Sequence, residues 1–323
     1  MISRKLAIRA AAFLALLLSN SSAWAETYPT RPIRLVIPYT PGGVVDTIGR
    51  VLAQHLSSEL AQPVVAENKP GAGGILGTDT VARERPDGYT LLLMDPAIVI
   101  NPTLQKNVHY DLFKLDALSI ISSSPLVLVA APELKVTTVH ALTDYGKAHP
   151  EGLNFASAGV GTTPHLAGEM LKQRTGVSAT HVPYRGIASA YTDLMTNKVQ
   201  FAFSSIAGAL PFTADNRVVA LATTGDTRIS VYPDKPTMQE AGLKDFSVDL
   251  WLGVFAPQGL PNDVRSKLRA ALEKSLSDGE LKTAFANVGA TPRGTSPEEA
   301  AAVVKSEYEK WKKIIVDGNI GEK

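Results

Sequence analysis

The chain contains no cysteine among its 323 residues. Disulfide bonds are therefore excluded, as is a thioether-linked lipid on a processed N-terminal cysteine. Beyond the N-terminal segment the sequence also lacks the run of about 18 apolar residues that a membrane-spanning helix requires. Low-complexity tracts and short repeats are absent as well. We therefore expect the mature chain to be soluble and globular.

Neither sign of charge is in excess, because 32 basic residues face 31 acidic ones. Removal of residues 1–25 would take away three basic residues and no acidic one, which leaves 29 against 31 and a net charge of −2. No cluster of basic residues stands out. A neutral chain of this kind offers no electrostatic footprint for nucleic acid or for an anionic membrane surface.

The motifs of the common enzyme classes are also missing. There is no G-x-x-x-x-G-K-[ST] loop of a nucleotide triphosphatase and no G-x-S-x-G turn of an α/β hydrolase. Gly71–Gly77 resembles a dinucleotide fingerprint, but its third glycine comes one residue late. The histidines never stand four residues apart, the helical spacing for zinc: His55, His109, His140, His149, His165 and His181. We therefore predict a binding protein without metal or cofactor, not an enzyme.

The N-terminal segment has the three parts of a secretory signal peptide. Basic residues come first, the apolar stretch Ala10–Leu18 follows, and Ala23-Trp24-Ala25 matches a small-residue cleavage site. Nine strongly apolar residues are too few to cross a bilayer, which needs about 20. The sequence predicts a signal peptide over residues 1–25, cleavage after Ala25 and a freely diffusing periplasmic protein.

Short apolar runs alternate with amphipathic segments along the mature chain. The runs predict these strands: 33–38, 64–68, 90–94, 125–131, 153–157, 180–183, 199–204, 218–223 and 248–256. The amphipathic spacing predicts these helices: 44–60, 74–83, 163–174, 188–196 and 206–214, with two more from Pro261 and from the capping residue Ser296. Such alternation is typical of an α/β protein with parallel sheets.

Two long apolar strands that end near a proline predict two crossings between lobes, near 122–132 and near 248–257. The first lobe would then comprise residues 26–124 and 250–323. The second would comprise residues 125–249. A length of 298 residues after cleavage is enough for two separate cores.

Two glycine-rich turns carry the functional prediction. One contains Gly42 and Gly43 before the helix that begins at Val44, and the other contains Gly159 and Gly161 before the helix at Thr163. A strand that enters a helix through glycines leaves several backbone N–H groups free, and the helix dipole adds partial positive charge. One such turn alone is more often an ordinary tight turn. Two of them predict two lobes that grip one small anion.

Six motifs occur in an order that resembles one family. They are PGGVVD (41–46), ENKPGAGGILG (67–77), PDGYTLLL (86–93), FASAGVGTTPHLAGE (155–169), HVPYRG (181–186) and WLGVFAPQGLP (251–261). Together they resemble the extracytoplasmic solute receptors of tripartite tricarboxylate transporters, also called the Bug family. The resemblance covers residues 28–316.

The resemblance implies a two-lobe, type II periplasmic-binding-protein fold, with two mixed, mostly parallel sheets flanked by helices and a hinge of two crossing strands. It implies a small organic mono- or dicarboxylate ligand held in the cleft, largely by backbone amides and water. The membrane subunits of the transporter would be the partner, and the receptor would be a monomer. Val44 and Val45 depart from many relatives, which have a small or hydroxyl residue before the aspartate, so position 45 cannot make a polar contact.

The candidate ligand-binding residues come from both loops and their surroundings: Tyr39, Gly42, Gly43, Asp46, Ala158, Gly159, Gly161, Thr162, Thr163, His165, Tyr184 and Ser205. Some of them have a second interpretation. Asp46 either contacts ligand or water, or lies in its first helical turn because the dipole favours a carboxylate there. His165 either contacts ligand or packs, and the two tyrosines either line the cleft or belong to the core.

Alternative functions stay open at this point. The receptor of an ATP-driven importer shares the expected fold, and a ligand sensor that serves a signalling protein would look the same.

Overall fold

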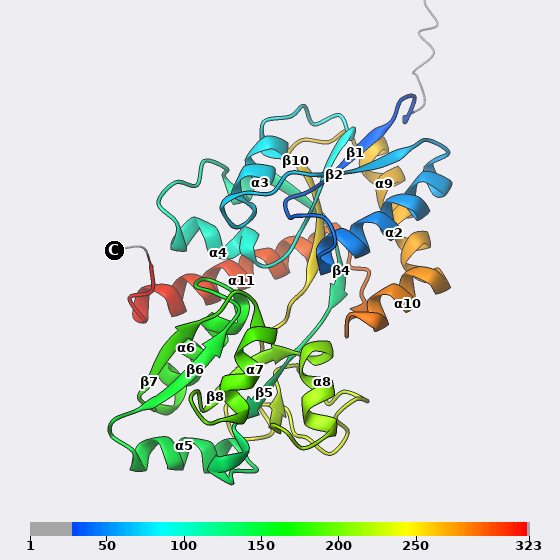
Figure 1. The fold of residues 1–323 in the computed structure, drawn as a ribbon. Helices are drawn as coiled ribbons and strands as arrows, with labels where there is room; N and C mark the ends of the chain where they lie inside the picture. The colour runs from blue at the N-terminus through cyan, green and yellow to red at the C-terminus, as the bar shows by residue number, and fades with distance from the viewer. Residues whose placement is uncertain (1–27, 322–323) are drawn as a thin grey trace, which may run out of the picture. The chain divides into compact units, whose positions relative to one another are not determined.

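The computed structural model describes residues 28–321. Residues from Arg31 onward form one compact unit, and all that follows concerns this unit. It is a two-lobe α/β fold with one sheet in each lobe (Figure 1). The predicted signal peptide, residues 1–25, lies outside the described residues.

The first sheet has the strand order β11-β4-β10-β3-β1-β2. Its strands are β1 (Ile33–Ile37), β2 (Val64–Asn68), β3 (Thr90–Met94), β4 (Leu115–Ser123), β10 (Leu252–Pro257) and β11 (Thr291–Pro292). Strand β1 runs parallel to β2 and β3, whereas β10 is antiparallel to β3 and β4. All five residues of β3 are buried, as expected for a central strand that is covered on both faces.

The second sheet has the order β7-β6-β8-β5-β9. Its strands are β5 (Leu126–Ala130), β6 (Leu153–Ser157), β7 (Ala179–Pro183), β8 (Phe201–Ser205) and β9 (Val219–Thr223). Strand β6 is parallel to β7 and β8, and β5 is antiparallel to β8 and β9. Both sheets are therefore mixed, with parallel and antiparallel pairs. Strands β5 and β10, which follow the two passages of the chain from one sheet to the other, run antiparallel to their neighbours.

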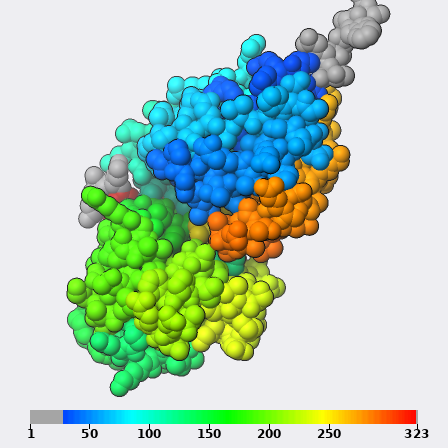
Figure 2. Space-filling view, turned by 45° about the vertical axis from the view of Figure 1, so that its right-hand side comes forward, coloured from blue at the N-terminus to red at the C-terminus, as the bar shows by residue number. Residues whose placement is uncertain are grey.

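Helices flank both sheets. Those of the first lobe are α2 (Val44–Leu60), α3 (Ile75–Ala82), α4 (Ala97–Leu104), α9 (Asn262–Ser277), α10 (Gly279–Asn287) and α11 (Pro297–Asp317). Those of the second are α5 (Val139–Ala148), α6 (Thr163–Thr175), α7 (Tyr191–Met195) and α8 (Ile206–Ala214). Short 3-10 turns are η1 (Ala72–Gly74), η2 (Leu112–Lys114), η3 (Pro132–Leu134) and η4 (Ile187–Ala190). In Figure 2 the blue segment that contains α2 and the orange segment of α9 and α10 lie side by side, and the green middle segment lies below them.

Several predicted elements keep their type but change their bounds. The helix predicted over 188–196 is divided into η4 and α7. The strand predicted from Val248 begins only at Leu252, since Asp249 forms an isolated bridge with Pro125 instead. Strand β4 and helices α4 and α5 are not among the elements that the apolar spacing predicts.

The two chain crossings are held together by Asp249. Its carboxylate accepts hydrogen bonds from the Ser123 hydroxyl (2.6 Å) and from the Ser124 N–H. The Leu250 N–H donates to the Ser124 carbonyl at 2.9 Å. Burial raises the pKa of Asp249. The strand order places the crossings between β4 and β5 and between β9 and β10; the residue limits of the two lobes, 26–124 with 250–323 and 125–249, stay a prediction.

Helix α11 begins with a strong N-terminal signal. The Ser296 hydroxyl accepts from the Glu299 N–H, and the Glu299 carboxylate accepts from the Ser296 N–H, which makes a complete capping box. The far end of the helix reaches the second lobe, because the Gln173 side chain on α6 donates to the Ile314 carbonyl at 2.9 Å. This helix therefore contacts both lobes.

Candidate functional site

A cavity of about 630 Å³ opens between the two lobes, in the range typical of small-molecule sites. Figure 2 shows the surface hollowed where the blue and green segments face each other. The first lobe contributes Tyr39, Val44, Val45, Ile48, Gly73, Asp95, Ala97, Ile100, Asn101, Leu104, Gln105, Ser122, Ser124, Leu250, Leu252, Phe285, Asn287, Val288 and Ala290. The second contributes Ala158, Val160, Gly161, Thr162, Thr163, Pro164, Ile187, Ser205 and Ala207.

Four helices turn their N-terminal ends toward this cavity. The residues that line it include Val44 at the start of α2, Ala97 at the start of α4, Thr163 at the start of α6, and Ser205, the N-cap of α8. Helix N-termini carry partial positive charge and unpaired N–H groups. No lysine, arginine or histidine is among the described residues that line the cavity. Any anion here would be held by backbone amides, dipoles and hydroxyls.

The two glycine loops are built in the same way. In each, a glycine with positive φ precedes the helix: Gly42 at +86° and Gly161 at +79°. In each, the third helical residue accepts a hydrogen bond from that glycine. The Gly42 N–H donates to the Asp46 carboxylate at 2.8 Å, and the Gly161 N–H donates to His165 Nδ1 at 3.0 Å. The same hydrogen bond, from a glycine N–H to the third helical residue, therefore shapes both loops.

Asp46 is a structural anchor of the first loop. Besides the Gly42 N–H, its carboxylate accepts from Arg50 Nε at 3.0 Å and from Asn68 Nδ2 at 2.8 Å. Burial alone would raise the pKa of Asp46, but these hydrogen bonds outweigh it and lower the pKa to about 2. The side chain is 4% exposed and is absent from the cavity lining.

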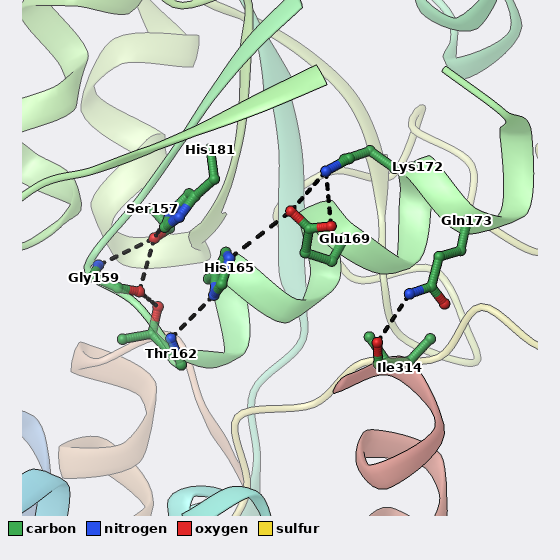
Figure 3. A network of polar contacts seen from close by, with 10 residues as sticks. Ser157, Gly159, Thr162, His165, Glu169, Lys172, Gln173, His181 and Ile314 are labelled. Carbon is green, nitrogen blue, oxygen red and sulfur yellow. Dashed lines mark hydrogen bonds and ion pairs between the residues drawn. The ribbon is translucent and has the colours of Figure 1, made fainter. Parts of the chain in front are cut away.

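The second loop is supported by a network of polar side chains, drawn in Figure 3. Ser157 Oγ lies 2.6 Å from His181 Nε2 and accepts from the Gly159 N–H at 3.1 Å. The Thr162 hydroxyl donates to the Gly159 carbonyl at 2.8 Å. On α6, Lys172 donates to both oxygens of Glu169, whose Oε1 is 3.9 Å from His165 Nε2.

His165 and His181 stack with ring centroids 3.8 Å apart. Burial lowers the pKa of His165 to about 3 and that of His181 to about 4, and the Lys172 charge acts in the same direction on both. Because Nδ1 of His165 accepts from the Gly161 N–H, a neutral ring carries its proton on Nε2. Both rings are therefore neutral near pH 7 and shape the loop without contributing charge.

The lowered pKa values of His165 and His181 predict that the protein loses stability in acid. The unfolded histidines have an ordinary pKa of 6.5, above the folded values of about 3 and about 4. The unfolded chain binds more protons between these limits, so the stabilisation is complete above pH 6.5 and is lost as the pH falls toward 4. Each pKa unit is worth about 1.4 kcal/mol, so we expect His165 alone to account for several kcal/mol.

Urea unfolding measured from about pH 7 down to about pH 4 tests this expectation. Asp95 and Asp249, whose pKa burial raises, act in the opposite direction, so variants must isolate the effect. His165→Gln should flatten the acid decline. His140→Gln, an exposed control on α5, should leave it unchanged. Equal declines in the parent and in His165→Gln would contradict the assignment.

The predicted site residues divide into two groups. Those that line the cavity are Tyr39, Ala158, Gly161, Thr162, Thr163 and Ser205. Those outside the lining are Gly42, Gly43, Asp46, Gly159, His165 and Tyr184. Most of the second group form hydrogen bonds within the two loops. Tyr184 instead donates from its hydroxyl to Asp193 at 2.7 Å, and burial, reinforced by Asp193, raises its pKa to about 12.

Sequence reasoning missed six polar residues in the lining: Asp95, Asn101, Gln105, Ser122, Ser124 and Asn287. Asp95 follows the buried strand β3 directly, so it stands at the carboxyl end of a central strand, next to the end of the parallel strand β1. A polar residue at that point was an available signal, because ligands bind at the carboxyl ends of parallel strands. Asn101 and Gln105 had none, since α4 was not predicted.

One cluster within residues 28–321 has the composition of a metal site: His55, Asp278 and Glu280. Asp278 accepts from the Glu280 N–H at 2.7 Å and so caps α10. His55 Nε2 lies 3.4 Å from Asp278. This cluster lies outside the cavity lining, and helix capping accounts for the position of Asp278.

The model of one family, the tripartite tricarboxylate transporter family receptor, matches residues 48–320. The chain belongs to this family. The receptor is 36% identical to a UPF0065 protein of Pseudomonas sp. (strain P51), over 96% of this chain and 94% of the relative. A UPF0065 protein of Bordetella pertussis is 34% identical, over 95% of this chain and 96% of its own length.

Solved structures agree with this assignment. The periplasmic binding protein BugD is 33% identical to the receptor with a TM-score of 0.73, which covers 92% of this chain and 100% of that one. The R. palustris protein Rpa4515, solved with adipate, is 30% identical with a TM-score of 0.75, over 91% of this chain and 99% of that one. The resemblance to the Bug family and the two-lobe fold are confirmed. The receptor is a solute-binding protein and not an enzyme.

Proposed function

We propose that the receptor captures a small organic carboxylate in the cavity between its lobes and delivers it to the membrane subunits of a tripartite tricarboxylate transporter. The observation that carries this proposal is the set of helix N-termini at a cavity whose described lining has no cationic side chain. That arrangement suits a small anion held by amides. Family membership and the adipate held by Rpa4515 support the same ligand chemistry.

We further propose that the receptor acts as a monomer in the periplasm after loss of residues 1–25. The relative BugD is a periplasmic binding protein. None of the helices within residues 28–321 has the length and apolar character needed to span a bilayer. Mass spectrometry of the exported protein would give its first residue, for which we expect Glu26.

The proposed grip uses both loops, with the amides at the starts of α2 and α6 and the hydroxyls of Thr163 and Ser205. Thr163 lines the cavity, and its hydroxyl has no hydrogen-bond partner among residues 28–321. The Ser205 hydroxyl accepts from the Gly208 N–H at 3.3 Å, which leaves its own proton free to donate. Thr162 is a weaker candidate, because its hydroxyl already donates to Gly159.

Thr163→Val tests this grip, because it keeps the shape of the side chain and removes the donor. A hydrogen bond to a charged group is worth about 1.5–3 kcal/mol, so affinity should fall about 10- to 150-fold. Thr192→Val is the matched control, on the exposed side of α7 in the same lobe. Calorimetric titration is carried out with the best acid from a thermal-shift screen that includes adipate.

The outcomes separate the function from the site. If no organic acid in the screen stabilises or binds the parent, the proposed function is wrong. If acids bind and Thr163→Val binds them as tightly as Thr192→Val does, the function stands and the placement of the carboxylate is wrong.

A further inference from the structure

We propose that the cavity accepts a monocarboxylate with an apolar body and a hydrogen-bond donor at its far end, and that Asp95 receives this donor and excludes a second carboxylate. This inference rests on the proposed function and narrows its ligand class. Three features of the lining carry it: its apolar walls, its lack of cations and the position of Asp95.

Most of the cavity wall is apolar. The apolar side chains come from α2, α4, the start of β10 and the residues before it, the end of α10, the second loop and η4: Val44, Val45, Ile48, Ile100, Leu104, Val160, Ile187, Leu250, Leu252, Phe285 and Val288. A ligand that carries polar groups along its whole length would lose hydration against this surface. An apolar body gains free energy there in proportion to the area it buries.

The lining provides for a single anionic end. Its ionisable side chains, within the described residues, are Tyr39 and Asp95, and neither can be cationic. One carboxylate can be held at the helix N-termini, but a second one would lie among apolar side chains without a charged partner. An unpaired buried charge is costly.

Asp95 occupies the N-terminus of α4. Its Oδ1 accepts from the Ala97 N–H at 2.9 Å and from the Tyr39 hydroxyl at 2.7 Å. The chain's own carboxylate thus takes the positive end of this helix, which leaves α2, α6 and α8 for the carboxylate of the ligand. The two ends of the cavity therefore differ: backbone amides at α2, α6 and α8 favour an anion, and the Asp95 carboxylate favours a hydrogen-bond donor.

The second oxygen of Asp95 is available to a ligand. It accepts no hydrogen bond from another residue within 28–321, and the residue lines the cavity. Burial raises the pKa of Asp95, and a bound donor such as an ammonium or hydroxyl would relieve that cost. A carboxylate at the same place would be repelled, because two like charges at short distance are unfavourable.

Matched acids of equal chain length test the inference: hexanoate, adipate, 6-hydroxyhexanoate and 6-aminohexanoate. The set is repeated from butyrate to octanoate so that chain length does not decide the result. At the best length, the monocarboxylate should bind at least about tenfold more tightly than the dicarboxylate. The acids with a terminal donor should bind more tightly than the unsubstituted acid.

Asp95→Asn should weaken the preference for an acid with a terminal donor over the dicarboxylate. The asparagine oxygen still accepts from Tyr39 and Ala97, while its amide now donates into the cavity. We expect the preference for the amino acid over adipate to fall at least about tenfold. Asp144→Asn, an exposed aspartate on α5, removes the same charge and should leave every ratio unchanged.

Three results would contradict the inference that the cavity prefers a monocarboxylate. Adipate bound as tightly as hexanoate by the parent overturns the inference while the proposed function stands. An Asp95→Asn variant with the parent's ratios also overturns it. If no carboxylate of any length binds, the proposed function fails first. The parent's ratio of hexanoate affinity to adipate affinity decides by itself. The inference can therefore be tested even if Asp95→Asn does not fold.

Discussion

Replacing Gly161 by alanine should weaken ligand binding about tenfold or more while the protein stays folded. A Cβ at this position would lie 2.1 Å from Leu104 Cδ2, which belongs to α4 on the facing lobe. Relief of such an overlap moves either the loop or the end of the Leu104 side chain and costs up to about 3 kcal/mol. The clash would hold the second loop away from α4, so that the two lobes could not close on a carboxylate in the present arrangement. Calorimetric titration measures the effect.

Gly176→Ala is the matched control. Gly176 lies at the other end of the same helix with φ +73°, close to the +79° of Gly161, but a Cβ there would meet nothing within 4 Å. Both variants carry the left-handed strain of about 1–2 kcal/mol, and both should lose that much stability. Only Gly161→Ala should lose affinity.

A second variant isolates the contact itself. In a Leu104→Ala background the added methyl group finds space, so Gly161→Ala should then cost much less affinity than it does in the parent. An equal loss in both backgrounds would mean that strain in the loop, and not the approach of Leu104, controls binding.

The positions of the two loops could be predicted because their signals are local. Glycine is required where φ is positive, as at Gly42 and Gly161, and each glycine stands between an apolar strand and an amphipathic helix. Gly43 is different: its φ of −77° is open to any residue. The sequence alone could not show that Gly42, and not Gly43, has the positive φ, since this depends on how the turn closes on Asp46.

The partners of the side chains could not be predicted. Asp46 and His165 look like ligand contacts in the sequence, yet each accepts a hydrogen bond from a glycine four residues earlier. Asp95 shows the opposite case. Its position directly after β3 could be read from the sequence, but its hydrogen bond at the start of α4 could not, because the apolar run of α4 contains Pro102 and lacks a clear polar face. Tertiary packing, which the sequence pattern does not encode, decides which polar groups remain free.

Asp46→Ala should destabilise the receptor by about 1–3 kcal/mol and abolish tight ligand binding, although Asp46 does not line the cavity. The carboxylate accepts from a backbone amide and two side chains. Its removal leaves the Gly42 N–H without an acceptor, and the Asn68 amide keeps only the Tyr39 carbonyl. The first loop then loses the bond that fixes its turn, so the amides at the start of α2 no longer converge.

Arg50→Ala separates this role from the surface ion pair. Arg50 is 51% exposed and approaches Asp46 with Nη2 at 3.0 Å, and exposed ion pairs contribute about 0–1 kcal/mol. Urea unfolding and calorimetric titration should therefore show a small change for Arg50→Ala and a large one for Asp46→Ala. The pKa of about 2 for Asp46 adds a pH test: its contribution is present above pH 3.8 and is lost as the pH falls through about 2. If Asp46→Ala kept the parent's stability but lost binding, Asp46 would be a ligand contact and not the anchor of the loop.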